Sequence, residues 1–548
     1  GGNYNVVVGD EAGTAITTGD QNVFIGYQAG DATTTAGFNI GIGYNALGAN
    51  ILGGRSVAIG NAALEAQNYG TATDAYNVAI GHGAGEAVTT GVNNTLIGGL
   101  AGDALTTSSN ATAVGYLALS ADTAGYNVAV GAFAGSGITS GTRNTAVGPA
   151  SLQVATTGSD NTSFGANALK AATTSSRNTA VGSYALVYNT TASQNTAVGY
   201  SSLSTNSTGA YNTALGDESL ASCTTGSSNT AVGNDALYGA TTGVHLTAVG
   251  DQAISANTTG AYNVAVGGNA LTTSVTGYFQ TAVGYGALQN SNYTANVYAF
   301  NTAVGYNAGK ANTTGKVTAF GGNALMANTT GIMNAAFGGA TDAYGSALQV
   351  NTTGSYNTGL GYVALRSNTT GNYNTALGCL AGSVITTGSY NTCVGFGTGT
   401  SITTGSYNVG IGDDALRTIT TGGRNLSMGR YAGYGITTSG DNVCIGYLTG
   451  YAGGGSNQLT SGYANLLVGN YCNVAASGDA ASTVIGHSQT GKGSETFFAG
   501  GSNGAYQQNN SSSWSQTSDR RLKKNIVDSP IGLAEINQLQ VRNFEYRT

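Results

Sequence analysis

A short apolar segment that ends in glycine recurs along most of the chain. Its clearest form is residues 178–182 (Asn-Thr-Ala-Val-Gly), and its glycine returns in eight steps of 17 residues from Gly148 to Gly284. From Gly9 to Gly500 there are 29 such anchor glycines, and 21 of the 28 intervals between them are 17 residues long. A fixed period of this size is typical of a solenoid, in which each repeat stacks on the next.

Positions within one repeat can be numbered from the anchor glycine. Position −1 is apolar, as in Val181, position −2 is small, as in Ala180, and position −3 is Thr or Val. Because side chains alternate along a strand, positions −1 and −3 share one face, and position −2 shares the other with the glycine. A second apolar site follows at position +4. Its occupants include Leu152, Leu169, Leu186, Leu203, Leu220, Leu237, Ile254, Leu271 and Leu288.

This pattern predicts one coil per repeat, with two short strands and two corners. One corner is often Thr-Thr-Gly, as at residues 224–226, and we expect its glycine to supply a positive φ. Stacked coils would pair their strands in parallel, and the Val and Leu side chains would form a thin continuous core. Asn at position −4, such as Asn178 and Asn195, would form a side-chain ladder. Residues 1–500 are therefore predicted to form an all-β, parallel β-solenoid or β-roll.

The small residues at position −2 form a second row along the array. We interpret this row as a face where another backbone comes close, and hence as an interface between copies of the chain. The alternative is that alanine simply fits a crowded corner.

Composition is consistent with an ordered repeat array. Charged residues make up 7% of the 548 residues and hydrophobic residues 41%, whereas disordered chains are usually highly charged. Before Ser518 the chain carries 11 basic and 20 acidic side chains, spread thinly. Nucleic acid and anionic lipid both need clustered Lys and Arg, so neither is an expected partner. The sequence contains no run of 18 apolar residues, so membrane insertion is not expected.

Residues that could carry chemistry are sparse in the array. The five cysteines lack metal-site spacing and are expected to be free thiols, and the three histidines are too scattered to form a metal site. The acidic pairs Asp413-Asp414 and Asp217-Glu218 are adjacent in sequence, so in a strand they would point to opposite faces. We therefore expect no cofactor, no metal and no enzyme activity in the array.

Tyrosines mark the candidate binding surface. Some intervals are longer than 17 residues, and extra residues in a solenoid form loops on one face, often the binding face. These insertions contain Tyr293, Tyr298 and Tyr451, and a periodic stripe is formed by Tyr356, Tyr373, Tyr390 and Tyr407. Aromatic rings beside Asn, Thr and Ser suit a sugar-binding surface. The alternative is an aromatic ladder that only stiffens the stack.

The last part of the chain differs in character. Residues 501–517 lose the period and suggest a linker or fibre end. Residues 518–548 read Ser-Asp-Arg-Arg-Leu-Lys-Lys-Asn-Ile, then a predicted short amphipathic helix after Asp528-Ser529-Pro530, then Phe544-Glu545-Tyr546. This segment closely resembles the opening of the C-terminal intramolecular chaperone domain of phage tailspikes and tail fibres, best known from endosialidases. The match covers the first third or less of such a domain.

The resemblance implies a homotrimer whose chaperone domain aligns three chains and then cuts itself off. Carried across, Ser518 would be the nucleophile and Lys523 its general base, with cleavage between Thr517 and Ser518. A serine hydroxyl needs a nearby base, and a lysine can serve where burial lowers its pKa. Because near-identical coils can pair one step out of place, a domain that sets the register has a clear physical role.

The array is similar in style to the β-roll heads of trimeric autotransporter adhesins, which implies a left-handed coil and a trimer. We therefore expect a rigid fibre of the phage tail fibre type, located on the virion or another extracellular surface. It would bind a host-surface glycan and other virion or fibre proteins. A bacterial surface adhesin is the first alternative, and an anchor or secretion signal upstream of Gly1 would indicate it. A glycan-degrading tailspike is the second.

Overall fold

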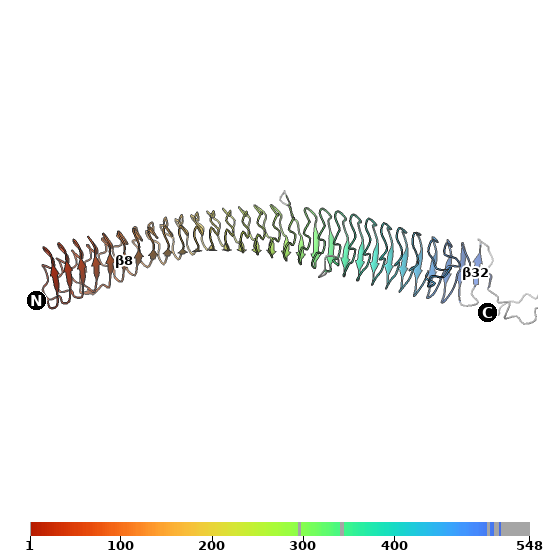
Figure 1. Ribbon diagram of the computed structural model, residues 1–548, viewed down its shortest axis with the longest axis horizontal. Helices are drawn as coiled ribbons and strands as arrows, with labels where there is room; N and C mark the ends of the chain where they lie inside the picture. The colour runs from red at the N-terminus through yellow and green to blue at the C-terminus, as the bar shows by residue number, and fades with distance from the viewer. Residues whose placement is uncertain (1, 294–296, 340–344, 501–504, 509–514, 517–548) are drawn as a thin grey trace, which may run out of the picture. The chain divides into compact units, whose positions relative to one another are not determined.

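Short strands joined by turns make up the computed structural model. The residues that it describes are 2–293, 297–339, 345–500, 505–508 and 515–516. None of these residues is helical, and a strand of three or four residues precedes each of the 29 anchor glycines. The prediction of an all-β parallel β-solenoid of about 29 coils is therefore confirmed. The coils fall into two compact units, Gly1–Tyr407 (unit 1) and Asn408–Thr548 (unit 2), each a series of coils in chain order (Figure 1).

The strands are short and regular in length. Those of unit 1 are β1 (Val6–Val8), β2 (Val23–Ile25), β3 (Ile40–Ile42), β4 (Gly53–Gly54), β5 (Val57–Ile59), β6 (Thr73–Asp74), β7 (Val78–Ile80), β8 (Thr95–Ile97), β9 (Thr112–Val114), β10 (Val128–Val130), β11 (Thr145–Val147), β12 (Thr162–Phe164), β13 (Thr179–Val181), β14 (Thr196–Val198), β15 (Thr213–Leu215), β16 (Thr230–Val232), β17 (Thr247–Val249), β18 (Val264–Val266), β19 (Thr281–Val283), β20 (Thr302–Val304), β21 (Val317–Phe320), β22 (Asn334–Phe337), β23 (Thr358–Leu360), β24 (Thr375–Leu377) and β25 (Thr392–Val394). Those of unit 2 are β26 (Val409–Ile411), β27 (Leu426–Met428), β28 (Val443–Ile445), β29 (Leu466–Val468), β30 (Thr483–Ile485), β31 (Thr496–Ala499), β32 (Ala505–Gln508) and β33 (Ser515–Gln516).

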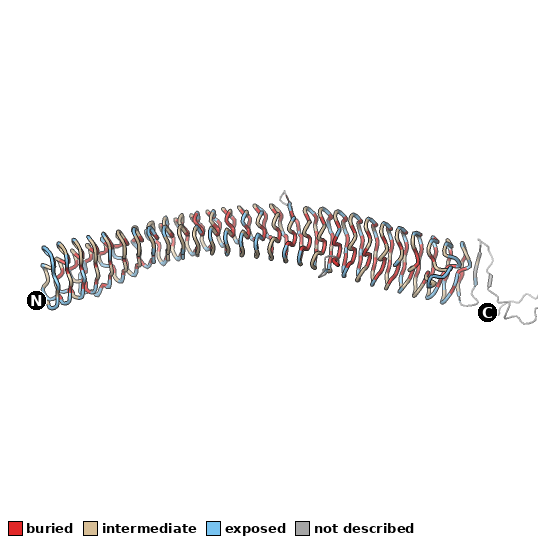
Figure 2. Tube along the Cα trace, viewed as in Figure 1, coloured by how far each residue is buried: buried red, intermediate tan, exposed pale blue. Residues whose placement is uncertain are grey.

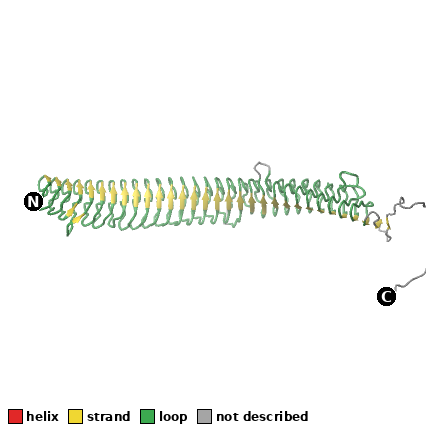
Figure 3. Cartoon of the chain, turned by 90° about the horizontal axis from the view of Figure 1, so that it is seen from below, coloured by secondary structure: helices red, strands yellow, loops and turns green. Residues whose placement is uncertain are grey.

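Within each unit the strands pair in parallel and in register. Strand β13 pairs with β14 so that Thr179 lies opposite Thr196, 17 residues later. The strands follow one another along one side of the coils, except for β4 and β6, which pair with each other in a separate sheet (Figure 3). The pattern changes at the end of unit 2, where β31, β32 and β33 pair antiparallel. Strands β32 and β33 lie in the segment that the sequence suggested as a linker or fibre end.

The interior of each coil lies on the alanine side of its strand. Ala180 is fully buried, as are the equivalent residues Ala146 and Ala197, whereas Val181 is half-buried and Phe164 is 55% exposed. Figure 2 shows the buried segments along the inside of the coils. The sequence-based placement of Val in the core, and of the alanine row at an interface between copies, is therefore wrong. The coil is thin, so only a small side chain fits between the strand and the +4 leucine.

The +4 leucines do form the core, but the side that carries them is not a strand. Leu169 and Leu186 are fully buried, and their φ angles are +51° and +52°. Their backbone N–H groups donate to the next coil, as from Leu186 to the carbonyl oxygen of Ser202 at 3.0 Å. A left-handed non-glycine residue costs about 1–3 kcal/mol, and full burial of a leucine side chain offsets this by about 1.5–3 kcal/mol. The prediction of two strands per coil is therefore wrong, since one side consists of hydrogen-bonded turns.

Two alternative sets of residues fill this core. In several coils position +4 is glycine, and an aliphatic side chain at position +7 occupies the space instead. These pairs are Gly13 with Ile16, Gly85 with Val88, Gly102 with Leu105, Gly135 with Ile138, Gly382 with Ile385, Gly399 with Ile402 and Gly433 with Ile436. A Cβ atom on Gly135 would lie 3.0 Å from Cδ1 of Ile138, so the two positions compete for one volume.

Glycine is required at two places in the coil for different reasons. The anchor Gly182 has a φ of +131°, and a Cβ atom there would lie 2.4 Å from the carbonyl oxygen of Gly199. Gly226 of the Thr-Thr-Gly corner does not have a positive φ, contrary to expectation. A Cβ atom on Gly226 would lie 2.4 Å from the carbonyl oxygen of Gly243, so close approach of the next coil explains this glycine.

The predicted asparagine ladder at position −4 is present and buried. The backbone N–H of Asn178 donates to Oδ1 of Asn161 at 3.0 Å, and that of Asn161 donates to Oδ1 of Asn144 at 3.0 Å. Each side-chain amide also caps a turn, as Nδ2 of Asn161 does by donating to the carbonyl oxygen of Ser175 at 2.9 Å. The ladder therefore satisfies backbone groups that the three-residue strands leave unpaired.

Candidate functional site

The residues at position −5 form an exposed corner that could bind a ligand. Many have a left-handed backbone, as Tyr356 does with a φ of +59°. Since the same position recurs in consecutive coils, neighbouring side chains interact. Arg143 and Asp160 form an exposed ion pair at 2.6 Å, and Arg424 and Asp441 form another at 2.6 Å in unit 2. We call this series the −5 row.

The predicted tyrosine stripe is a stacked ladder within the −5 row. Tyr356, Tyr373, Tyr390 and Tyr407 have successive ring centroids 4.8 Å apart and ring planes within 10° of parallel. The rings cover one another, so the inner faces of the ladder are closed to a sugar that would stack on them. What remains accessible along the stripe is the ring edges and hydroxyl groups.

A second aromatic cluster of unit 1 is less regular and more open. His245, Tyr262, Phe279 and Phe300 stack along the −5 row with centroid separations of 5.1–5.5 Å. Tyr298 adds to this stack from the insertion between Gly284 and Gly305, with its ring tilted by 50° to that of Phe279. Tyr298 is 62% exposed and Phe300 is 60% exposed. A hollow of about 270 Å³ lies beside Phe300 and is also lined by Lys316 and Met333.

Tyr293 is not part of an exposed surface. Its side chain is buried, its hydroxyl donates to the carbonyl oxygen of Gly315 at 2.7 Å, and it accepts from Nδ2 of Asn301 at 3.0 Å. Burial raises the pKa of this phenol. Tyr69 has the same arrangement in another 21-residue interval, and burial raises its pKa to about 12. These tyrosines fill the enlarged coils, so the expectation that Tyr293 is exposed is wrong.

In unit 2, Tyr451 belongs to a compact aromatic cluster. Its ring centroid lies 4.6 Å from that of Tyr434 and 6.2 Å from that of Tyr431. Arg430 lies over the ring of Tyr431 at 4.8 Å and also pairs with Asp413 at 3.0 Å. The rings are half-buried and tilted rather than stacked, so parts of their faces remain accessible.

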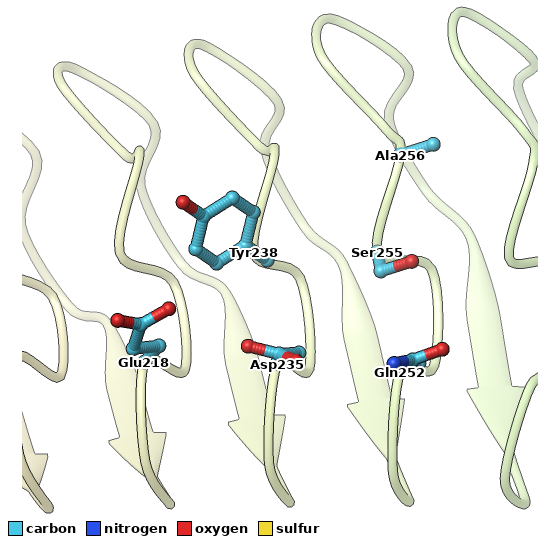
Figure 4. Close-up of a pocket in the computed structure, with 6 residues that line it drawn as sticks. All are labelled: Glu218, Asp235, Tyr238, Gln252, Ser255 and Ala256. Atoms are coloured by element: carbon cyan, nitrogen blue, oxygen red, sulfur yellow. The ribbon is translucent and has the colours of Figure 1, made fainter.

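The structure brings together two carboxylates that sequence reasoning did not pair. Glu218 and Asp235 occupy position +2 of consecutive coils and line a hollow of about 340 Å³ with Gln252 and Tyr238 (Figure 4). Their 17-residue separation was the signal that could have found them. By contrast, Asp414 pairs with Arg417 at 2.8 Å, while its neighbour Asp413 pairs with a different arginine.

Other kinds of site have little support in the described part of the chain. It holds no group of three or more His, Cys, Asp or Glu side chains that could bind a metal ion. The five cysteines are free thiols, and burial raises the pKa of Cys393 and of Cys444 to about 12. Among the residues described there is no helix long and apolar enough to cross a membrane.

The predicted self-cleavage residues, Ser518 and Lys523, lie outside the described residues, as does the rest of the segment 518–548. No protein family model, no curated protein and no solved structure matches this chain. The candidate function therefore depends on the repeat architecture, the exposed aromatic clusters and the C-terminal sequence motif.

Proposed function

We propose that this protein is a structural fibre of the phage tail fibre type that attaches to a glycan on a host surface. The observation that carries the proposal is a coil of mostly 17 residues, repeated about 29 times with the strand before each anchor glycine paired in register with the next. Each coil contacts only its neighbours, so added coils extend the stack without a new fold. Such an array suits a spacer that is displayed on the virion or another extracellular surface.

Assembly as a homotrimer is part of the same proposal. It is supported by the resemblance of residues 518–548 to an intramolecular chaperone domain, which would align three chains and then leave by cleavage at Thr517-Ser518. The expected product of the full-length chain ends at Thr517, and Ser518→Ala and Lys523→Ala leave the chain intact. Mass spectrometry measures the product, and equal processing of wild type and both variants would refute these roles.

Glycan attachment is proposed at the cluster formed by Tyr298, Phe279 and Phe300. Tyr298 is exposed and tilted, and Phe300 is exposed beside the hollow, so these two rings can stack on the apolar face of a sugar. Phe279 lies between Tyr262 and Phe300 and is covered, as the rings of the tyrosine ladder are. Aromatic side chains that stack on nucleic-acid bases contribute about 1–3 kcal/mol each. With a contribution of about 1 kcal/mol for each ring that stacks on a sugar, removing two rings should weaken binding at least about 10-fold.

Binding of the full chain to a panel of bacterial surface polysaccharides tests the site. Tyr298→Ala with Phe300→Ala should lose binding, whereas the matched ladder change Tyr373→Ala should not. Loss only in the Tyr373→Ala variant would place the glycan on the ladder. Equal binding of all variants would contradict an aromatic site in unit 1 and direct attention to Tyr451.

Two alternatives follow from the same architecture. A bacterial surface adhesin would share the repeats, and the genes beside this one would distinguish a secretion system from tail and baseplate components. A glycan-degrading tailspike would use carboxylates, for which Glu218 and Asp235 are the candidates. New reducing ends after incubation with a polysaccharide, lost in Glu218→Gln and Asp235→Asn, would favour that activity.

A further inference from the structure

One face of the β-sheet in unit 1 is uncharged and exposed or half-buried, with apolar side chains at position −1 and mostly threonine at position −3. It consists of the side chains at positions −3 and −1, which we call the strand face. Since position −2 points into the coil, the strand face is the outer side of the sheet. Its apolar members that are more than one-third exposed are Val6, Val8, Ile25, Ile40, Ile80, Val128, Val130, Phe164, Leu215, Val266, Phe320, Phe337, Leu360 and Leu377. Five threonines at position −3 are exposed as well, namely Thr162, Thr196, Thr213, Thr358 and Thr375.

The strand face carries no charge. Among the strands of three or four residues from β1 to β25, no position holds Asp, Glu, Lys or Arg, and −3 is usually Thr or Val. Apart from Asp74 in the two-residue strand β6, the charged side chains described in unit 1 lie at corners and turns, as Arg143 and Asp160 do. When one face of a sheet remains in water, apolar and polar residues normally alternate along each strand, so that the face in water is polar. Parallel sheets are normally covered on both faces. The continuous apolar row at position −1 is therefore of the kind that another surface normally covers.

The size of the strand face is sufficient for a stable interface. Full burial of an aliphatic side chain removes roughly 100 Å² from water, and about 40 Å² per coil remains available where a third to a half is exposed. The 14 apolar members and the five threonines that are more than one-third exposed make 19 side chains, which at about 40 Å² each give roughly 760 Å² per chain, against about 800 Å² per partner in a standard interface. Apolar patches of this size mark interaction sites.

The periodicity of the strand face indicates which kind of partner can fit it. Its side chains repeat once per coil, at the spacing of parallel strands, which is about 4.8 Å. A partner can match this row over many coils only if it has the same repeat, and a second copy of the chain has it. In a parallel, rotationally symmetric assembly each residue meets its own copy at the same level. Phe164 would therefore meet Phe164 of the other copies, and Leu215 would meet Leu215.

We infer that copies of this chain associate side by side through the strand face. The inference rests on the proposed homotrimer and specifies which surface forms it. Contact there covers the apolar side chains at position −1 and the Thr and Val side chains at position −3, and it leaves the −5 row free. The aromatic cluster around Tyr298 and the ion pair of Arg143 with Asp160 would then remain on the outside of the assembly, where a glycan can reach them.

Charge placed on the strand face provides the first test. Val130→Lys with Val266→Lys introduces two cations at exposed positions, and the matched control Thr157→Lys with Thr259→Lys introduces them at exposed turns. Burial of an unpaired charge should weaken association of the full chain at least about 100-fold, measured by sedimentation velocity. The control should retain the mass of the wild type, and circular dichroism checks that both variants keep the fold.

Cross-linking provides a second test, which does not require the fold to tolerate a lysine on the strand face. In a Cys379→Ser background, Val130→Cys should form covalent oligomers with a short bis-maleimide, and the corner variant Thr157→Cys should not. Cross-linking of only Thr157→Cys, with association unchanged in the lysine variants, would overturn the strand face but leave the fibre proposal intact. A wild-type chain that is monomeric at all concentrations would overturn both the inference and the proposed homotrimer.

Discussion

Removal of one buried amide from the asparagine ladder should destabilise the coils around it. Asn161 is 1% exposed, and its Oδ1 accepts the backbone N–H of Asn178 at 3.0 Å. Its Nδ2 donates to the carbonyl oxygen of Ser175 at 2.9 Å. Asn161→Ala removes both partners at once and leaves a backbone donor and a backbone acceptor inside the coil without their hydrogen bonds.

The size of the effect follows from these two groups. An unsatisfied buried donor or acceptor costs about 1–3 kcal/mol, so Asn161→Ala should lower the local unfolding free energy by about 2–6 kcal/mol. The loss should stay local, because Ala111 and Leu246 occupy the same position in two other coils and the ladder continues beyond both.

Asn161→Asp tests the two hydrogen bonds separately, because it keeps the side-chain acceptor and removes the side-chain donor. The carboxylate still accepts from Asn178 but faces the carbonyl oxygen of Ser175, so the folded state favours the protonated acid and the pKa of that acid is raised. A raised folded-state pKa makes an acid destabilising above its unfolded pKa and harmless below it. The variant should therefore be weaker than wild type at pH 7 and recover as the pH falls below about 4.

Hydrogen exchange of the full chain measures the local effect, since long repeat arrays need not unfold in two states. Amides in β12 (Thr162–Phe164) and β13 (Thr179–Val181) should lose protection, while those of β18 (Val264–Val266) should not. The control is Asn234→Ala, which removes an exposed amide that donates to the carboxylates of Asp235 and Asp251, and its loss should cost less than about 0.5 kcal/mol. The same small loss in Asn161→Ala would refute the account of the ladder.

Two further predictions concern the interior of unit 1. Gly135→Leu should cost about 1–3 kcal/mol by clashing with Ile138, and Ile138→Ala about 2–5 kcal/mol, but the double variant should cost at least about 1 kcal/mol less than their sum in urea denaturation; additive losses would contradict the shared volume. Burial raises the pKa of Asp122, although a hydrogen bond from Asn127 opposes the shift. A raised acid pKa destabilises the fold above the unfolded pKa, so Asp122→Asn should stabilise the protein at pH 7 and lose that gain near pH 3. A gain that persists near pH 3 would indicate packing rather than charge.

For the candidate sites, the sequence indicated which tyrosines lie on the repeating stripe or in an insertion, but not how their side chains pack. It identified the stripe that contains Tyr373 and the insertion that contains Tyr298. It could not distinguish Tyr293 from Tyr298, since both lie in one insertion and only their packing differs. It also missed Glu218 with Asp235, because residues far apart in sequence become neighbours when one coil stacks on the next.

By itself the sequence determined the period, the short parallel strand before each glycine, the buried +4 leucines and the asparagine ladder. All of these follow from spacing, since residues 17 apart must occupy the same place in successive coils. Only the tertiary structure decided which face of the strand is interior. Because side chains alternate along a strand, Val181 and Ala180 must point in opposite directions, but this rule does not say which of the two points into the coil. The narrow space opposite the leucines admits alanine, and so the apolar valines remain on the outside.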